Sequence, residues 1–266
     1  QAIARRMALA VAARLNGLTD DPATDAVAAY KSLVGDGNLR DHGKGKPLAE
    51  QDDAGIEWHH VYDEMFEKFY RTPDHVRALF DEIMCEAGEP VNWAHLCLGE
   101  LVARNRVSTV LTTNFDQLVL TGMVHAGVLP VMCDGIESLN RIAPHPRHPQ
   151  LVELHGSRHA YRLRNHPDEV ARVREIPGAI EAVRGLLHEA ITFVVVGYGG
   201  REDGVMDLLV DAAESYPDKN LFWVQYSNRP DDLSPKAKRF LATSRNAGQL
   251  LGQDADVFFL DLCREL

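Results

Sequence analysis

Residues 191–200 read ITFVVVGYGG, an apolar run that is broken only by Thr192 and ends in glycines. Its length is typical of a strand buried on both faces, and the glycines predict a tight turn into the helical pattern at 205–209. Helix-length segments separate several such runs in the second part of the chain. This alternation predicts an α/β protein with a Rossmann-like, doubly wound parallel sheet. The other apolar runs lie at 107–111, 129–132, 151–154 and 221–226.

The first part of the chain has a helical pattern instead. Apolar residues recur at helical spacing, and a polar, glycine-rich stretch at 35–55 predicts a loop. We therefore expect residues 1–106 to be mainly helical, as an insertion or subdomain, and residues 107–266 to form the sheet of the same domain. The helical patterns cover 3–15, 58–69, 76–83 and 93–101.

Composition excludes several classes of protein. The net charge of −11 argues against direct binding of duplex nucleic acid, which needs Lys and Arg opposite the phosphates. No run approaches the roughly 20 apolar residues of a membrane span. The four cysteines lie far apart and form no C-x-x-C pair, so we expect no zinc module and reduced thiols in a cytoplasmic protein. These are Cys85, Cys97, Cys133 and Cys263.

Polar residues follow the first predicted strand, in the segment VLTTNFD at 110–116. A strand here runs directly into Thr112, Thr113, Asn114 and Asp116, and ligands of parallel sheets bind beyond the carboxyl ends of the strands. The alternative is structural, because Asn114 could simply cap the helix that begins near Leu118.

A histidine follows another strand, in the segment LVELHGS at 151–157. His155 at such a strand end can titrate near neutral pH and move a proton, with the hydroxyl of Ser157 close by in sequence. A surface-loop histidine bonded to backbone is the alternative.

Two further segments have the same character. Glycines at 197–200 allow a ligand to approach the backbone, although the G-x-G-x-x-G spacing is absent and a tight structural turn also accounts for them. The segment GQDADVFF at 252–259 places an acidic residue before the last helix, where capping is a sufficient explanation.

Together and in this order, the four segments resemble the sirtuin superfamily. In that family a T-Q-N-x-D segment, an L-H-G-S segment, a later G-T/Y-S turn and a terminal G-D-x-D helix start surround NAD. The resemblance runs from Val107 to the C-terminus.

The resemblance implies a role for each matching residue. Asn114 would orient a water or polarise the ribose, Asp116 would hold the nicotinamide carboxamide, and His155 would be the general base toward a ribose hydroxyl. Ser157 would support His155 or the ribose. The remaining positions would bind the cofactor, namely Thr112, Thr113, Gly197, Tyr198, Gly199, Asn228 and Asp256. Of these, Asn228 and Asp256 would lie near the adenosine.

The chain departs from the protein-deacylating sirtuins in two ways. Residues 157–196 contain no cysteine, where deacylases carry two C-x-x-C pairs, and Thr113 replaces the Gln of T-Q-N. The acidic stretch at 201–203 and residues 164–169 are similar to the sirtuin-like domains of bacterial antiphage proteins. The family's Gly-Ala-Gly-x-Ser loop does not occur, and we expect it to precede Gln1 in a longer protein.

The sequence therefore predicts an NAD hydrolase, with NAD as substrate and no metal. We expect an oligomer that is regulated by a sensor domain or partner chain, because unrestrained NAD hydrolysis would kill the host. The first alternative is a zinc-less protein deacylase, in which nicotinamide release depends on an acyl-peptide. The second is an NAD or ADP-ribose sensor without turnover.

Overall fold

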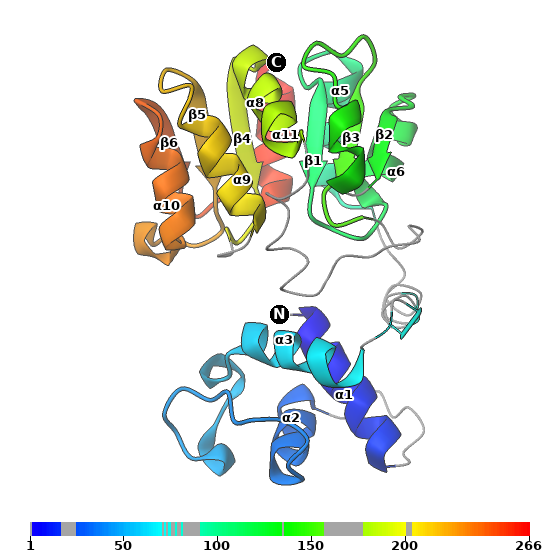
Figure 1. Ribbon diagram of the computed structural model, residues 1–266, viewed down its shortest axis with the longest axis vertical. Coiled ribbons are helices and arrows are strands. Elements are labelled where there is room, and N and C mark those ends of the chain that lie inside the picture. Colours follow the sequence, from blue (N-terminus) through cyan, green and yellow to red (C-terminus); the bar gives the residue numbers. More distant parts are fainter. Residues whose placement is uncertain are drawn as a thin grey trace. The chain divides into compact units, whose positions relative to one another are not determined.

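The computed structural model describes residues 2–16, 25–70, 72, 74–75, 78, 81, 91–134, 136–156, 178–200 and 204–266 (Figure 1). The chain forms two compact units, residues 1–88 and residues 89–266. Most of the helix predicted at 76–83 lies outside the described residues. That the two parts form one domain stays a prediction.

The first unit is helical. It contains α1 (Ala2–Asn16), α2 (Ala26–Gly35) and α3 (Trp58–Phe69), with short 3-10 turns η1 (Leu48–Glu50) and η2 (Asp53–Gly55) in the predicted loop. Helix α1 packs against both α2 and α3. The predictions of α1, α3 and the loop are confirmed, whereas α2 was not predicted. The fully buried side chains of this core include Met7, Tyr30, Trp58 and Met65.

A buried carboxylate ties α3 to the loop before it. Glu64 is 2% exposed and accepts hydrogen bonds from the backbone N–H of Arg40 at 3.0 Å and from Lys68 Nζ at 2.9 Å, while His42 Nε2 lies 2.7 Å from its Oε2 atom. Burial opposes ionisation of Glu64, but these hydrogen bonds outweigh it and lower its pKa to about 2.

Among its described residues, the second unit holds two parallel sheets of three strands each. Strands β1 (Thr109–Thr112), β3 (Gln150–Glu153) and β2 (Val131–Asp134) lie in the order β1-β3-β2. Strands β4 (Thr192–Val196), β5 (Asn220–Val224) and β6 (Asn246–Leu250) lie in the order β4-β5-β6. All four strand pairings are parallel. The predicted parallel α/β fold is confirmed, with the strands divided between two sheets and β6 as a strand that was not predicted.

Helices cover the sheets on both faces. Helices α5 (Trp93–Ala103) and α6 (Leu118–His125) enclose one core with β1 and β3, whereas α8 (Ala179–Glu189), α9 (Gly204–Ala213) and α10 (Pro235–Ala242) enclose a second. This second core contains Val152 of β3 and Val195 of β4, so the two sheets share it. In the view of Figure 1, α8 lies in front of α11 (Ala255–Glu265), between β4 and β1. Short turns η3 (Ile136–Arg141) and η5 (Pro230–Asp232) complete the described elements.

Within the described ranges, no helix combines the length and the hydropathy needed to cross a membrane.

Candidate functional site

The polar segments predicted from the sequence follow the carboxyl ends of neighbouring strands. Strands β1 and β3 pair in parallel with Thr112 opposite Glu153, and the pairing continues because the Leu154 N–H donates to the Thr112 carbonyl at 2.8 Å. The residues after Thr112 and after Leu154 therefore leave the same edge of the sheet. This is the edge at which parallel sheets bind ligands.

Asn114 does not cap a helix. Its backbone N–H donates to Oγ1 of Thr112 at 3.1 Å, and helix α6 begins only at Leu118. The side chain that binds the first turn of α6 is Asp116, whose Oδ1 accepts from the Leu118 N–H at 3.1 Å. The capping alternative for Asn114 is therefore wrong, and its exposed side chain is available to a ligand.

His155 is half-buried beside this segment. Its ring lies with its centroid 6.0 Å from that of Phe115, a buried residue between Asn114 and Asp116. Two residues before His155, at the end of β3, the buried carboxylate of Glu153 accepts a hydrogen bond from Gln117 Nε2 at 2.8 Å. These contacts hold the ends of β1 and β3 together and place the imidazole at their shared edge. Ser157, predicted to support His155, lies outside the described residues.

The glycine turn after β4 has one crowded position and two open ones. Gly200 has a φ of 60°, and a Cβ there would lie 2.8 Å from Cβ of Ala237 and 3.0 Å from the ring of Trp223. A Cβ on Gly197 or Gly199 would meet no described atom within 4 Å. Packing thus accounts for Gly200, whereas no atom of the described residues crowds Gly197 or Gly199.

Tyr198 lies within this turn and is half-buried. Its ring centroid is 6.1 Å from that of Trp223 in β5, which is 1% exposed. This contact places the Tyr198 ring against the core, between Gly197 and Gly199 in the sequence.

The loops after β5 and β6 are joined. The Gly252 N–H donates to the Ser227 carbonyl at 3.0 Å, and a Cβ on Gly252 would lie 2.0 Å from Oδ1 of Asn228. Glycine is required at 252, both for this close approach and for its φ of 62°. Asn228 itself is exposed at the same edge of the second sheet.

The two acidic residues before α11 have different roles. Asp254 is the N-cap, because its Oδ1 accepts from the N–H groups of Asp256 at 2.8 Å and Val257 at 3.4 Å. Asp256 instead reaches out of its helix, and its Oδ1 accepts from the Ala94 N–H at 2.7 Å in the first turn of α5. Capping therefore explains Asp254 but not Asp256.

His95 is a residue that the sequence patterns did not single out. Burial lowers the pKa of His95, and the carboxylates of Asp116 and Asp256 partly oppose this effect. Its Nδ1 atom is buried and has no hydrogen-bond partner in the described part of the chain. His95 thus lies within electrostatic reach of two predicted site residues. Nothing in the local sequence signals this, because the three residues are far apart along the chain.

The predicted residues fall into two groups. The first, beyond β1 and β3, has hydroxyl, amide, carboxylate and imidazole side chains, and the second, beyond β4 and β5, has open glycines, an aromatic ring and an amide. Asp256 bonds to Ala94 in α5, beside His95, which also lies within electrostatic reach of Asp116 of the first group. Such donors, acceptors and backbone groups can bind the hydroxyl, amide and phosphate groups of a polar ligand. The first group is Thr112, Thr113, Asn114, Asp116 and His155; the second is Gly197, Tyr198, Gly199 and Asn228.

Comparison with known families identifies the same region. A family model described as SIR2-like domain matches residues 108–246, just over half of the chain. The match begins directly before β1, ends at the first residue of β6 and contains the segments at 110–116, 151–157 and 191–200. No curated protein matches the chain. The match confirms the expected sirtuin-like domain and indicates an NAD-related enzyme function of the sirtuin type.

Proposed function

Because the chain belongs to the SIR2-like domain family, we propose that it is an NAD hydrolase that cleaves the nicotinamide–ribose bond to give nicotinamide and ADP-ribose. The observation that carries this proposal is the shared edge of β1 and β3. There the exposed Asn114 and the half-buried His155 leave neighbouring strands, supported by the contact between Phe115 and His155.

The chemistry needs little more than positioning and charge stabilisation. Nicotinamide departs uncharged from a cationic pyridinium, so the protein mainly holds the substrate, stabilises an oxocarbenium-like ribose and directs a water. We assign Asn114 to the water or the ribose, Asp116 to the nicotinamide carboxamide and His155 to the ribose hydroxyl as general base. Ser157 supports His155 or the ribose.

The rest of the dinucleotide requires contacts along both sheets. Thr112 and Thr113 lie beside Asn114 at the end of β1, and the open positions Gly197 and Gly199 leave room for phosphate or ribose oxygens next to the backbone. We place Tyr198 along the same part of the substrate. Asn228 and Asp256, which follow β5 and β6, are assigned to the adenosine end.

The sequence from the end of β3 to the end of β4 favours hydrolysis over protein deacylation. Residues 157–196 hold no cysteine, and a deacylase of this family uses two cysteine pairs there to build a zinc module beside its acyl-lysine groove. Without an acyl-lysine groove, water is the simplest acceptor of the ADP-ribosyl group, because it needs no binding surface for a second substrate.

We further propose that the chain is a regulated NAD-depleting effector in antiphage defence, active as a homo-oligomer. Two sequence segments that are similar to antiphage sirtuin-like domains support this assignment, at 164–169 and 201–203, both outside the described residues. Control by a sensor domain or partner chain follows from the toxicity of unrestrained NAD loss.

The test is nicotinamide release from NAD by the full-length protein, with and without an acetylated peptide. Release that does not depend on the peptide supports the hydrolase. Release only with the peptide would move the assignment to a deacylase, and NAD binding without release under activating conditions would move it to a sensor.

A further inference from the structure

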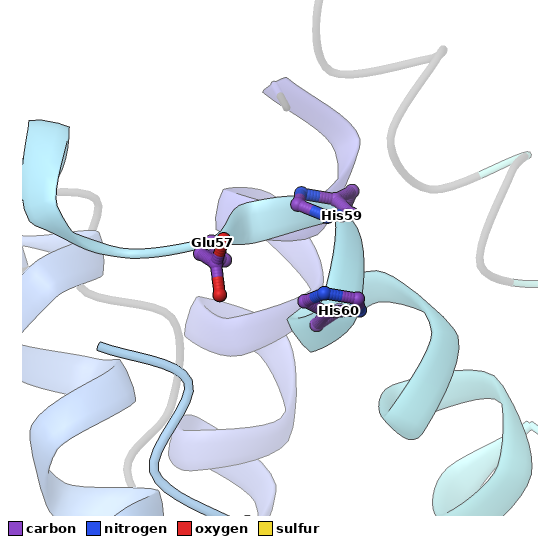
Figure 2. A group of neighbouring side chains, drawn as sticks. All are labelled: Glu57, His59 and His60. Carbon is purple, nitrogen blue, oxygen red and sulfur yellow. The ribbon is translucent and has the colours of Figure 1, made fainter. Parts of the chain in front are cut away.

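Three metal-ligating side chains meet at the start of α3, in the first unit and outside the residues assigned to NAD. One ligand atom each of Glu57, His59 and His60 lies within 4.8 Å of the other two. Figure 2 shows the two imidazoles on the first turn of α3 and the Glu57 carboxylate beside them. His59 and His60 are exposed and Glu57 is half-buried.

Helix capping does not account for Glu57. It occupies the N-cap position of α3, yet its side chain makes no capping hydrogen bond, and Glu is not among the residues preferred there. Its backbone is firmly held, because its N–H donates to the His42 carbonyl at 3.0 Å and its carbonyl accepts from the His60 N–H at 2.9 Å.

The turn that carries the three side chains is anchored in the core. Trp58, between Glu57 and His59, is 1% exposed, and its indole N–H donates to the Asp53 carboxylate at 3.1 Å. That carboxylate also receives two hydrogen bonds from Arg5, at 2.7 and 2.8 Å, so the Arg5 guanidinium is already paired. The backbone under the cluster is therefore anchored in the core.

The two imidazoles are unusually close for adjacent residues of a helix. Successive side chains point about 100° apart around a helix axis, yet the ring centroids of His59 and His60 are 4.0 Å apart. The ring of His42 lies 5.8 Å from that of His60, although its Nε2 is engaged with Glu64. Two exposed imidazoles and a carboxylate gathered in this way form a ligand set of two nitrogens and one oxygen.

We propose that Glu57, His59 and His60 bind a divalent transition metal ion, with Zn²⁺ as the best fit. Two imidazoles and a carboxylate suit zinc, whereas Mg²⁺ and Ca²⁺ require oxygen ligands. Ligand atoms in a tetrahedral zinc site are about 3.4 Å apart, so small rotations of the two exposed imidazoles close the site. The Glu57 carboxylate also offsets the positive end of the α3 dipole.

Three protein ligands leave one coordination position open. Glu57 and His59 also line a cavity of about 300 Å³, so the metal would border space that solvent can enter. None of the three residues belongs to the set assigned to NAD, for which we expect no metal.

Titration calorimetry of the metal-free full chain with Zn²⁺ tests the proposal, and Co²⁺ serves as a spectroscopic probe of coordination. We expect about one zinc per chain at pH 7.5, and weaker binding in more acidic buffer, because protons compete with the metal for its ligands. The variants Glu57→Gln, His59→Gln and His60→Gln should each weaken binding by at least about tenfold.

His125→Gln is the matched control, because His125 is exposed at the end of α6 and outside the cluster. Its zinc affinity should equal that of the wild type, and thermal denaturation should show that every variant is folded. The proposal is overturned if the wild type binds no zinc, or if the double variant His59→Gln/His60→Gln keeps the wild-type stoichiometry and affinity.

Discussion

The carboxylate of Asp256 accepts a hydrogen bond from the backbone N–H of Ala94 at 2.7 Å and so joins the first turn of α11 to the first turn of α5. The two residues are 162 positions apart in the sequence. The bond places the acidic segment after β6 next to His95, whose charge state also depends on Asp116 after β1. A residue assigned to the adenosine end is thus physically coupled to the predicted catalytic edge.

Loss of this bond should destabilise the second unit. Asp256→Ala removes a charged acceptor and leaves the Ala94 N–H unsatisfied, which should cost about 1.5–3 kcal/mol of unfolding free energy. Urea denaturation measures the change. Asp261→Ala is the control on the same helix, because its exposed pair with Arg264 should contribute at most about 1 kcal/mol. Equal losses in the two variants would contradict the role given to Asp256.

His95 should make the stability of the protein pH-dependent near neutrality. Because burial lowers its pKa in the folded state, the unfolded chain binds the proton more readily. The contribution of His95 to the free energy of unfolding is therefore present above the unfolded pKa of about 6.5 and is lost as the pH falls below that value. Urea denaturation at several pH values should show a shallower pH dependence in His95→Gln than in the wild type. An unchanged dependence would show that His95 does not titrate in this way.

Glu64 should control stability in a more acidic range. Its folded pKa of about 2 lies below the ordinary value of 4.5, so the stabilisation is complete above pH 4.5 and is lost as the pH falls toward 2. Glu64→Gln should cost about 2 kcal/mol at pH 7 and remove this acid transition. Denaturation midpoints between pH 2 and pH 6 provide the measurement. Glu100→Gln is the control, because Glu100 pairs with Arg104 on the surface.

The two glycines that frame the turn after β4 should respond differently to alanine. Both have positive φ, which costs an alanine about 1–2 kcal/mol, but only Gly200→Ala also meets Ala237 and Trp223. Gly200→Ala should therefore lose more stability, whereas Gly197→Ala should stay folded and bind NAD more weakly. Thermal denaturation and NAD titration of both variants test this. Stronger destabilisation by Gly197→Ala would contradict the assigned geometry.

Much of the parallel fold could be predicted from the sequence, because the apolar runs that became β1, β3, β4 and β5 are short and nearly continuous. Strand β6 was not predicted, since NAGQL at 246–250 has little apolar character and is recognised only by its pairing with β5. The division into two sheets also depends on which strands pair and leaves no local sequence signal.

The site shows the same limit. Asn114 and His155 could be selected because each follows a strand, and the parallel pairing of β1 and β3 places them at one edge. His95 could not, because it lies within a helix and its importance arises from two distant carboxylates. The separate tasks of Asp254 and Asp256 likewise depend on where α5 lies, which the acidic segment itself does not encode.

The most direct measurement is nicotinamide release from NAD by the full-length protein and its Asn114→Ala, His155→Ala, Cys133→Ala and His125→Gln variants. We predict that both site variants stay folded and lose turnover. His125→Gln and Cys133→Ala should keep it, the latter because burial raises the pKa of that thiol and keeps it an inert part of the core. Turnover retained by folded Asn114→Ala or His155→Ala protein would contradict the proposed active site.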